Sequence, residues 1–230
     1  LLPTSYYTAF TSLMIPDGEL RTIDGRLREV LASEACRGAC RTDHRWLNLT
    51  NTRWLVLDKV YDLVHEGVFY DTGLPVRLPA RWAIGYQVLD NFEATEVRVV
   101  YHCVAETCLP PSVGLSRDEV AQNLVHPVVP LADLDSGRRL AQYELDGPSV
   151  IDYVAIAFND EIVVDAVSVV DTRTGDFQQL TPTGWQRLLS SDIKLYENLD
   201  VDPRAFVVYN ANWFPDTNEG TELTLEFMRS

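Results

Sequence analysis

The four cysteines occur as two close pairs, and their spacing is the first feature of the chain that suggests chemistry. Three residues separate Cys36 from Cys40, and four separate Cys103 from Cys108. Structural zinc sites usually have a two-residue gap in at least one pair and often recruit histidine. The observed gaps therefore favour two local disulfides, formed in an oxidising compartment. A four-cysteine zinc site and pairing between the two clusters are alternatives that the sequence leaves open.

The sequence lacks several common hydrolase motifs. The four histidines are not arranged as HExxH, and neither a GxSxG elbow nor a phosphate-binding glycine motif is present. Glycoside hydrolysis needs two carboxylates across a groove, but 34 acidic residues bring carboxylates together by chance. The residues considered for such a pair are Asp90, Glu93, Glu96, Asp160, Glu161 and Asp165. We predict no catalytic residue and no metal-binding site, with a secreted glycan-active hydrolase as an alternative.

Tryptophans at the edges of predicted elements are candidate ligand-binding residues, because a flat apolar ring can stack on the C–H face of a sugar. Trp82, Trp185 and Trp213 lie at such edges, and the protein core is the alternative position for each. Trp54 lies inside an apolar run and is predicted to be buried. Arg204 carries five donors in a fixed fork. It is predicted either to anchor neighbouring carbonyl and carboxylate groups or to bind a ligand.

No cofactor is expected from the sequence. Oxygen ligands from Asp90, Asn91 or Asp171 would suit a structural calcium ion. The alternative is that these three are solvated loop residues. The calcium ion is therefore an open possibility and not a predicted cofactor.

Charge and hydropathy exclude several classes of partner for these 230 residues. The net charge of −15 argues against nucleic acid, because phosphate-backbone sites need clustered Lys and Arg. No run of about 18 apolar residues is present to span a bilayer. The chain begins Leu1-Leu2-Pro3, from which we expect a piece of a longer protein or a processed chain. Lys59 and Lys194 are the only lysines, a skew that we attribute to genome composition.

The elements that must position these side chains are mostly strands. Residues 96–101 and 139–145 alternate polar and apolar side chains, and two β-branched runs follow at 153–158 and 162–170. Short strands with regular turn signals predict a jelly-roll-like antiparallel β-sandwich over residues 80–182.

The remaining residues, 1–79 and 183–230, are predicted to form one discontinuous α/β layer. A helix is expected near residues 24–31. Strand 54–58 is expected to pair with the segments around Ile193 and Leu195 and at residues 206–208. The predicted fold is thus mainly β, a sandwich inserted in a small α/β layer that both termini form.

Three segments resemble a known family. YENLDVDPRAFVV at residues 196–208 is similar to the segment around the Pro-Arg pair of YfhO-type bacterial multi-spanning membrane proteins, which are related to membrane glycosyltransferases. LNLTNTRWLVLD at 47–58 resembles a strand of that family. VSVVDTRTG at 167–175 resembles the closing strand and turn of a galactose-binding-like jelly roll. This sequence has Asp202 where the family often has leucine.

The resemblance implies a non-catalytic extracytoplasmic domain of a membrane glycosyltransferase-like protein. Such a domain would lie at the outer face of the cell membrane, with its parent chain anchored there, and would bind or position a glycan. Transfer chemistry would depend on loops that this chain does not contain. A structural or protein-interaction domain without a ligand pocket is the alternative. The sequence makes no prediction of oligomeric state.

Overall fold

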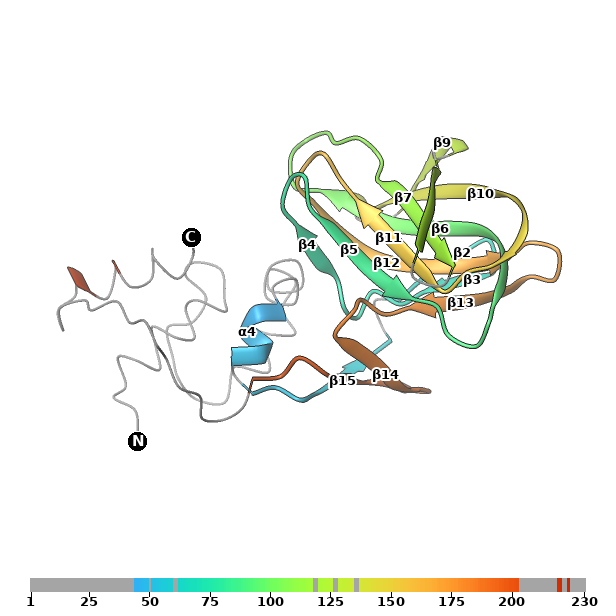
Figure 1. Ribbon diagram of the computed structural model, residues 1–230. Helices are drawn as coiled ribbons and strands as arrows, with labels where there is room; N and C mark the ends of the chain where they lie inside the picture. The colour runs from blue at the N-terminus through green and yellow to red at the C-terminus, as the bar shows by residue number, and fades with distance from the viewer. Residues whose placement is uncertain are drawn as a thin grey trace. The chain divides into compact units, whose positions relative to one another are not determined.

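The computed structural model describes residues 44–49, 51–59, 62–117, 120–125, 128–134, 137–202, 219–220 and 223 (Figure 1). The chain divides into two compact units. One comprises residues 1–51 with 202–230, and the other comprises residues 52–201. The second unit includes residues 52–79 and 183–201, which the sequence assigned to the α/β layer.

The described part of the first unit consists mainly of one short helix, α4 (His44–Leu49), and the residues beside it. The Asn51 side-chain amide donates to the Asp202 carbonyl at 2.6 Å, and the Asp202 amide donates to the Asn48 carbonyl at 3.2 Å. These bonds join the N-terminal and C-terminal parts of this unit. The predicted helix at residues 24–31 and the predicted strand at 206–208 lie outside the described residues.

The second unit is built from antiparallel sheets. The largest has the order β13-β12-β6-β10-β9, with β4 also pairing with β12; its strands are β4 (Val76–Leu78), β6 (Glu93–Cys103), β9 (Val128–Asp133), β10 (Arg139–Val150), β12 (Ile162–Asp171) and β13 (Asp176–Leu180). A second sheet has the order β5-β11-β7-β8, formed by β5 (Ala83–Gln87), β7 (Ser112–Arg117), β8 (Val120–Val125) and β11 (Tyr153–Ala157).

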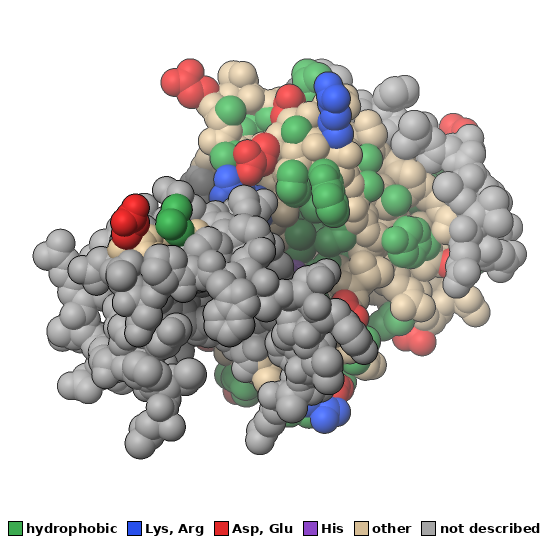
Figure 2. Space-filling view, turned by 60° about the vertical axis from the view of Figure 1, so that its left-hand side comes forward, with side chains coloured by type: hydrophobic (Ala, Val, Ile, Leu, Met, Phe, Trp, Pro, Cys, Tyr) green, Lys and Arg blue, Asp and Glu red, His purple; other side chains and the backbone are tan. Residues whose placement is uncertain are grey.

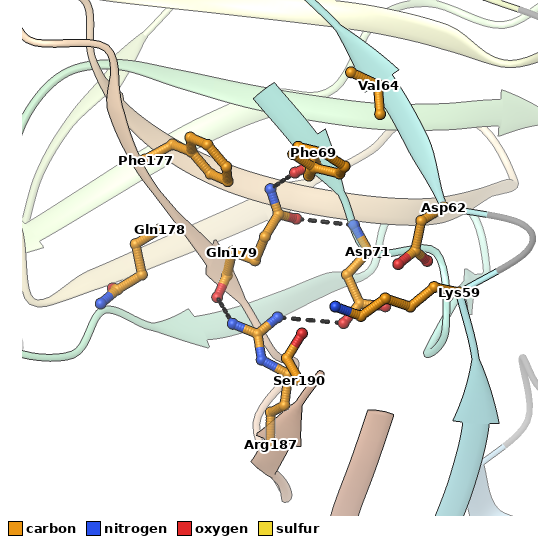
Figure 3. A pocket seen from close by; sticks show the side chains of 10 residues that line it. All are labelled: Lys59, Asp62, Val64, Phe69, Asp71, Phe177, Gln178, Gln179, Arg187 and Ser190. Atoms are coloured by element: carbon orange, nitrogen blue, oxygen red, sulfur yellow. Dashed lines mark hydrogen bonds and ion pairs between the residues drawn. The ribbon is translucent and has the colours of Figure 1, made fainter. Parts of the chain in front are cut away.

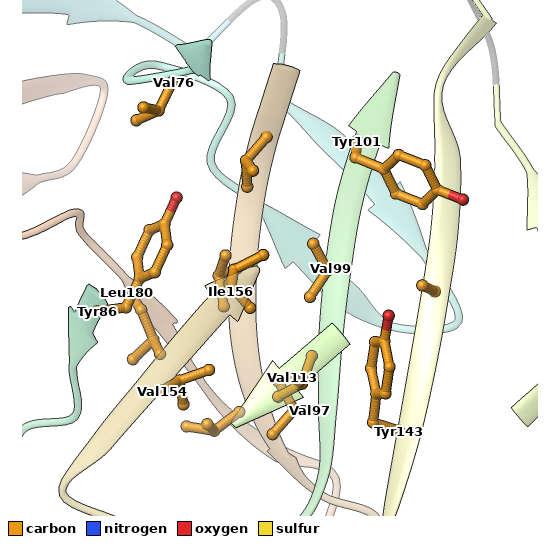
Figure 4. Close-up of a cluster of buried hydrophobic side chains, with 14 of the residues drawn as sticks. Val76, Tyr86, Val97, Val99, Tyr101, Val113, Tyr143, Val154, Ile156 and Leu180 are labelled. Carbon is orange, nitrogen blue, oxygen red and sulfur yellow. The ribbon is translucent and has the colours of Figure 1, made fainter. Parts of the chain in front are cut away.

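The main hydrophobic core lies between these two sheets, which makes the unit a β-sandwich. Val97 and Val99 of β6 pack in the same cluster as Val154 and Ile156 of β11, and all four are fully buried (Figure 4). Alternate residues of β6 enter this cluster, as the period-2 geometry of a strand requires. The predicted mainly β, sandwich-type fold is therefore confirmed.

A smaller sheet has the order β1-β15-β14, formed by β1 (Trp54–Asp58), β14 (Trp185–Ser190) and β15 (Ile193–Asn198). Val56 of β1 is opposite Leu195, and Asp58 is opposite Ile193. The predicted pairing of strand 54–58 with the segment around these two residues is confirmed.

The predicted burial of Trp54 is wrong, because 49% of this residue is exposed. Alternation along β1 places Trp54 and Val56 on the more exposed side, while Leu55 and Leu57 are partly buried. The Trp54 ring instead contacts the Arg53 guanidinium, whose carbon lies 5.0 Å from the ring centroid. Exposed apolar side chains also appear elsewhere among the described residues (Figure 2). The apolar run at residues 54–58 did not show which face of the strand packs against the rest of the protein.

One disulfide, between Cys103 and Cys108, closes the loop that follows β6. This confirms local pairing for the second cysteine pair. Cys36 and Cys40 lie outside the described residues. No helix in the described part of the chain has the length and apolar character needed to cross a membrane.

Candidate ligand-binding cleft

An open cleft of about 590 Å³ lies within the second unit (Figure 3). Its residues come from the hairpin β2 (Leu63–His65) and β3 (Val68–Tyr70), from β13 and β14, and from the segments beside β1 and β3. The lining residues are Lys59, Asp62, Val64, Phe69, Asp71, Phe177, Gln178, Gln179, Arg187 and Ser190. Two parts of the chain that are distant in sequence, residues 59–71 and 177–190, thus supply one site.

Two phenylalanine rings form the apolar side of the cleft. Phe69 and Phe177 are stacked, with ring centroids 6.5 Å apart and an interplanar angle of 24°. Phe69 is 56% exposed because β3 turns its neighbours Val68 and Tyr70 into the interior. Val64 of β2 lies opposite Phe69 in the hairpin and is also exposed. The cleft therefore offers a flat apolar surface to a ligand.

The hairpin that carries this wall depends on its two-residue turn. Glu66 and Gly67 have φ values of 49° and 78°. Positive φ at both central positions is the type I′ geometry that matches the twist of paired strands, and glycine is favoured there. The turn fixes the register Val64–Phe69, so both side chains emerge on one face.

A buried lysine holds two carboxylates at the polar end of the cleft. Lys194 of β15 is 1% exposed, and its ammonium contacts both Asp62 and Asp71; the Asp71 Oδ1 lies 2.6 Å away. A buried charge is tolerated only when it is paired and hydrogen-bonded. The compact ammonium group carries three donors, which suits it to join two carboxylates from different segments.

The Asp71 carboxylate accepts from four groups. Besides Lys194, these are the Arg187 guanidinium at 3.2 Å, the Tyr196 hydroxyl and the Gly73 backbone amide at 2.9 Å. An ionised carboxylate has about four acceptor positions, so these four donors occupy all of them. Asp71 therefore acts as a structural centre that joins β14, β15 and the segment after β3.

Gln179 of β13 fixes the hairpin against the large sheet. Its side-chain oxygen accepts from the Asp71 amide at 3.0 Å, and its side-chain nitrogen donates to the Phe69 carbonyl (Figure 3). The same nitrogen also donates to the Ser168 hydroxyl. Arg187 also donates to the Gln179 carbonyl at 3.3 Å. The aromatic wall and the charged end are thus parts of one hydrogen-bonded network.

The two carboxyls in this network have pKa values that are shifted in opposite directions. Burial raises the pKa of Asp62 and outweighs its attraction to Lys194. Burial also opposes ionisation of Asp71, but attraction to Lys194 and hydrogen bonds from Lys194, Tyr196 and Gly73 are stronger together, and they lower its pKa. Burial and the neighbouring Asp71 charge raise the pKa of Tyr196.

We expect Asp71→Asn to lower the free energy of unfolding by about 2–3 kcal/mol at neutral pH, because it removes charge-assisted hydrogen bonds from a buried cation. A lowered pKa stabilises the fold above the unfolded value of 3.8, and this contribution is lost as the pH falls through the folded value. The stability difference between wild type and variant should therefore shrink below pH 3.8.

Urea titrations at several pH values between about 2.5 and about 7 measure this difference. Asp62→Asn is the control, because the raised pKa of Asp62 has the opposite linkage sign. Relative to that variant, the wild type should lose stability as the pH rises. A difference for Asp71→Asn that is constant with pH would contradict the assignment.

Of the residues predicted as ligand contacts, the described ones, Trp82 and Trp185, are not among the described lining residues of this cleft. Trp82 precedes β5 and is 65% exposed, whereas Trp185 begins β14 and is 5% exposed. Trp213 and Arg204 lie outside the described residues. The aromatic surface of the cleft comes from Phe69 and Phe177, which the sequence reasoning did not select.

Most carboxylates that the sequence offered for hydrolysis are engaged in hydrogen bonds or ion pairs with other residues. Asp165 accepts from His102 at 2.7 Å and from Arg138 at 3.2 Å. Glu96 pairs with Arg98. Glu93 pairs with Arg173, Glu161 pairs with Arg77, and Asp160 accepts from the Leu109 amide. None of these carboxylates lines the cleft.

The residues considered for calcium lie in a turn and in an arginine pair. Asp171 makes three hydrogen bonds with Arg173, which lower the Asp171 pKa to about 2. Asp90 and Asn91 form a turn with positive φ at both positions. Within the described ranges, no group of three His, Cys, Asp or Glu side chains could hold a metal ion.

Comparison with known proteins adds no relative: no family model matches the chain, and no curated protein or solved structure matches it. The fold and the cleft define the class of protein as a mainly β domain with an open, partly aromatic and partly charged pocket.

The scarcity of lysine is the one feature of the sequence that could have drawn attention to this site, although we attribute it to genome composition. The chain has only two lysines, and one lines the cleft while the other pairs with two of its lining residues. Composition alone gave no reason to place them together, because Lys59 and Lys194 are 135 positions apart.

Proposed function

We propose that residues 52–201 form a non-catalytic domain that binds a carbohydrate in the cleft. The observation that carries this proposal is the stacked pair Phe69 and Phe177 facing polar side chains across a volume of about 590 Å³. Small-molecule sites are clefts of about 300–1,000 Å³ with apolar walls and a few placed polar groups. A sugar has that same division, with apolar C–H faces and hydroxyl edges.

The polar groups available to a sugar are those that the network leaves free. Arg187 uses two of its terminal nitrogens on Asp71 and Gln179, and no bond to its Nε is found in the described residues. The Ser190 hydroxyl and the Lys59 ammonium also line the cleft. These groups can donate to ring hydroxyls while the ring packs on Phe69.

Hydrolysis is the second candidate, and one observation favours it. Asp62 and Asp71 contact the same ammonium, so they lie close together, and their pKa values differ in direction, as in an acid and nucleophile pair. Against it, the Asp71 carboxylate is engaged by four donors and has no free position for attack. We therefore favour binding without bond cleavage.

The wider setting of the domain is also a proposal. The disulfide between Cys103 and Cys108 is typical of an oxidising compartment. Together with the similarity of residues 196–208 to YfhO-type proteins, it supports an extracytoplasmic domain whose parent chain is anchored in the membrane. In that setting the domain would hold a glycan near a membrane glycosyltransferase-like region.

We expect Phe69→Ala and Phe177→Ala to weaken monosaccharide binding at least tenfold, because each removes part of the stacking surface. Calorimetric titration of the whole chain with a panel of hexoses at millimolar concentration measures this effect. Trp82→Ala is the matched control, since it removes an exposed ring outside the cleft.

Three other results would each count against the proposal. No binding by wild type would favour the structural or protein-interaction alternative, to which the exposed Trp54, Val56 and Ile193 would then be relevant. A loss with Trp82→Ala alone would move the site to that residue. Release of reducing sugar from oligosaccharides, abolished in Asp71→Asn, would favour the hydrolase.

A further inference from the structure

The charges of the cleft do not cancel. Asp62 and Asp71 are the two carboxylates at the site, and Lys194 and Arg187 are the cations bound to them. Lys59 is a further cation in the lining. These five side chains comprise three cations and two carboxylates, a net charge of one positive unit. The whole chain, in contrast, has a net charge of −15.

Lys59 is placed to act on a ligand. Its side chain is exposed and extends from the end of β1 toward the polar end of the cleft (Figure 3). Across the described ranges, no hydrogen bond or ion pair joins its ammonium to another side chain. A cation left unpaired in so acidic a protein creates a local positive potential, which raises the concentration of anions at that point.

We infer that the cleft binds an acidic sugar, a pyranose with one anionic group, and that Lys59 pairs with that group. This inference rests on the carbohydrate function proposed above. The ring packs on Phe69 and Phe177, and its carboxylate or phosphate reaches the ammonium of Lys59. Asp62 and Asp71 do not repel this group, because Lys194 and Arg187 neutralise them.

Lysine fits either kind of anion. An ammonium is a compact charge with rotatable donors, whereas arginine imposes a planar, bidentate geometry. The anionic group is therefore defined by its charge and not by its shape. An amino sugar, in contrast, would place a second cation beside Lys59 and would bind less tightly than the neutral hexose.

The test compares sugars that share the glucose ring and differ in charge. The whole chain is titrated with glucose, glucuronate, glucose 6-phosphate and glucosamine, and with inorganic phosphate alone, at low ionic strength and again in 0.5 M salt, at which the Debye length is about 4 Å. Variants are Lys59→Gln, Lys59→Arg and, as a charge control outside the cleft, Arg81→Gln.

We expect glucuronate or glucose 6-phosphate to bind at least tenfold more tightly than glucose, and salt to reduce this preference. Lys59→Gln should abolish the preference, while Lys59→Arg and Arg81→Gln should keep it. Equal binding of neutral and acidic sugars would overturn the inference and leave the proposed function intact. Inorganic phosphate that binds as tightly as glucose 6-phosphate would also overturn the inference, because the sugar ring would then contribute nothing to binding.

Failure of all four sugars to bind would instead contradict the proposed function itself. A preference for acidic sugars that survives in Lys59→Gln would also overturn the inference, because another cation would then supply the charge. Circular dichroism of each variant checks that the fold is retained.

Discussion

Replacing Lys194 with methionine is expected to lower the free energy of unfolding by about 3–5 kcal/mol. The side chain is 1% exposed, and its ammonium lies between Asp62 and Asp71. Methionine fills much of the same volume but leaves Asp62 with no cation among the described residues. Breaking a buried pair from one side is costly, because the partner keeps its desolvation penalty without its compensating charge.

The other lysine of the chain is the matched control. Lys59→Met makes the same substitution at an exposed position of the same cleft, and should change the free energy of unfolding by about 0.5 kcal/mol or less. Adding Asp62→Asn to Lys194→Met should recover part of the loss, because it removes one uncompensated carboxylate. Urea denaturation at pH 7, followed by tryptophan fluorescence, measures all three. Equal effects from the two lysine substitutions would show that Lys194 is not buried.

Tyr143→Ala is expected to be similarly destabilising, by about 3–5 kcal/mol. Tyr143 is fully buried on β10, within the core between the two large sheets (Figure 4). Its hydroxyl donates to the carbonyl of Pro111, the residue immediately before β7 of the other sheet. Removing the ring leaves a cavity that packed neighbours cannot close, and it also breaks this link between the sheets.

Tyr143→Phe separates the two contributions. It keeps the ring and loses only the hydroxyl, so we expect a loss of about 1–2 kcal/mol, which reflects one hydrogen bond and an unsatisfied Pro111 carbonyl. Chemical denaturation with a calorimetric check gives both values. If Tyr143→Ala costs no more than Tyr143→Phe, the ring does not pack between the sheets, and the sandwich described here is wrong.

Strand patterns in the sequence predicted the fold class because they report burial that is local to one chain segment. The β-branched run at 162–170 is indeed the fully buried β12, and residues 96–101 lie inside β6. A strand covered on both faces needs apolar residues at nearly every position, and one covered on a single face needs alternation. Trp54 shows the limit of this reasoning, because an apolar run does not indicate which face of the strand is buried, and Trp54 is exposed.

The candidate site was decided only by the tertiary structure. The sequence by itself determined an acidic chain and predicted a mainly β fold, and cysteine spacing favoured local disulfides, of which the structure shows the one between Cys103 and Cys108. Nothing in the sequence joined Asp71 to Lys194 across 123 positions, or placed Phe69 beside Phe177. Motifs in sequence reveal sites built on one turn or helix. Here strand pairing and sheet packing bring residues 59–71 together with residues 177–196, and the charge balance of the cleft exists only after these two parts meet.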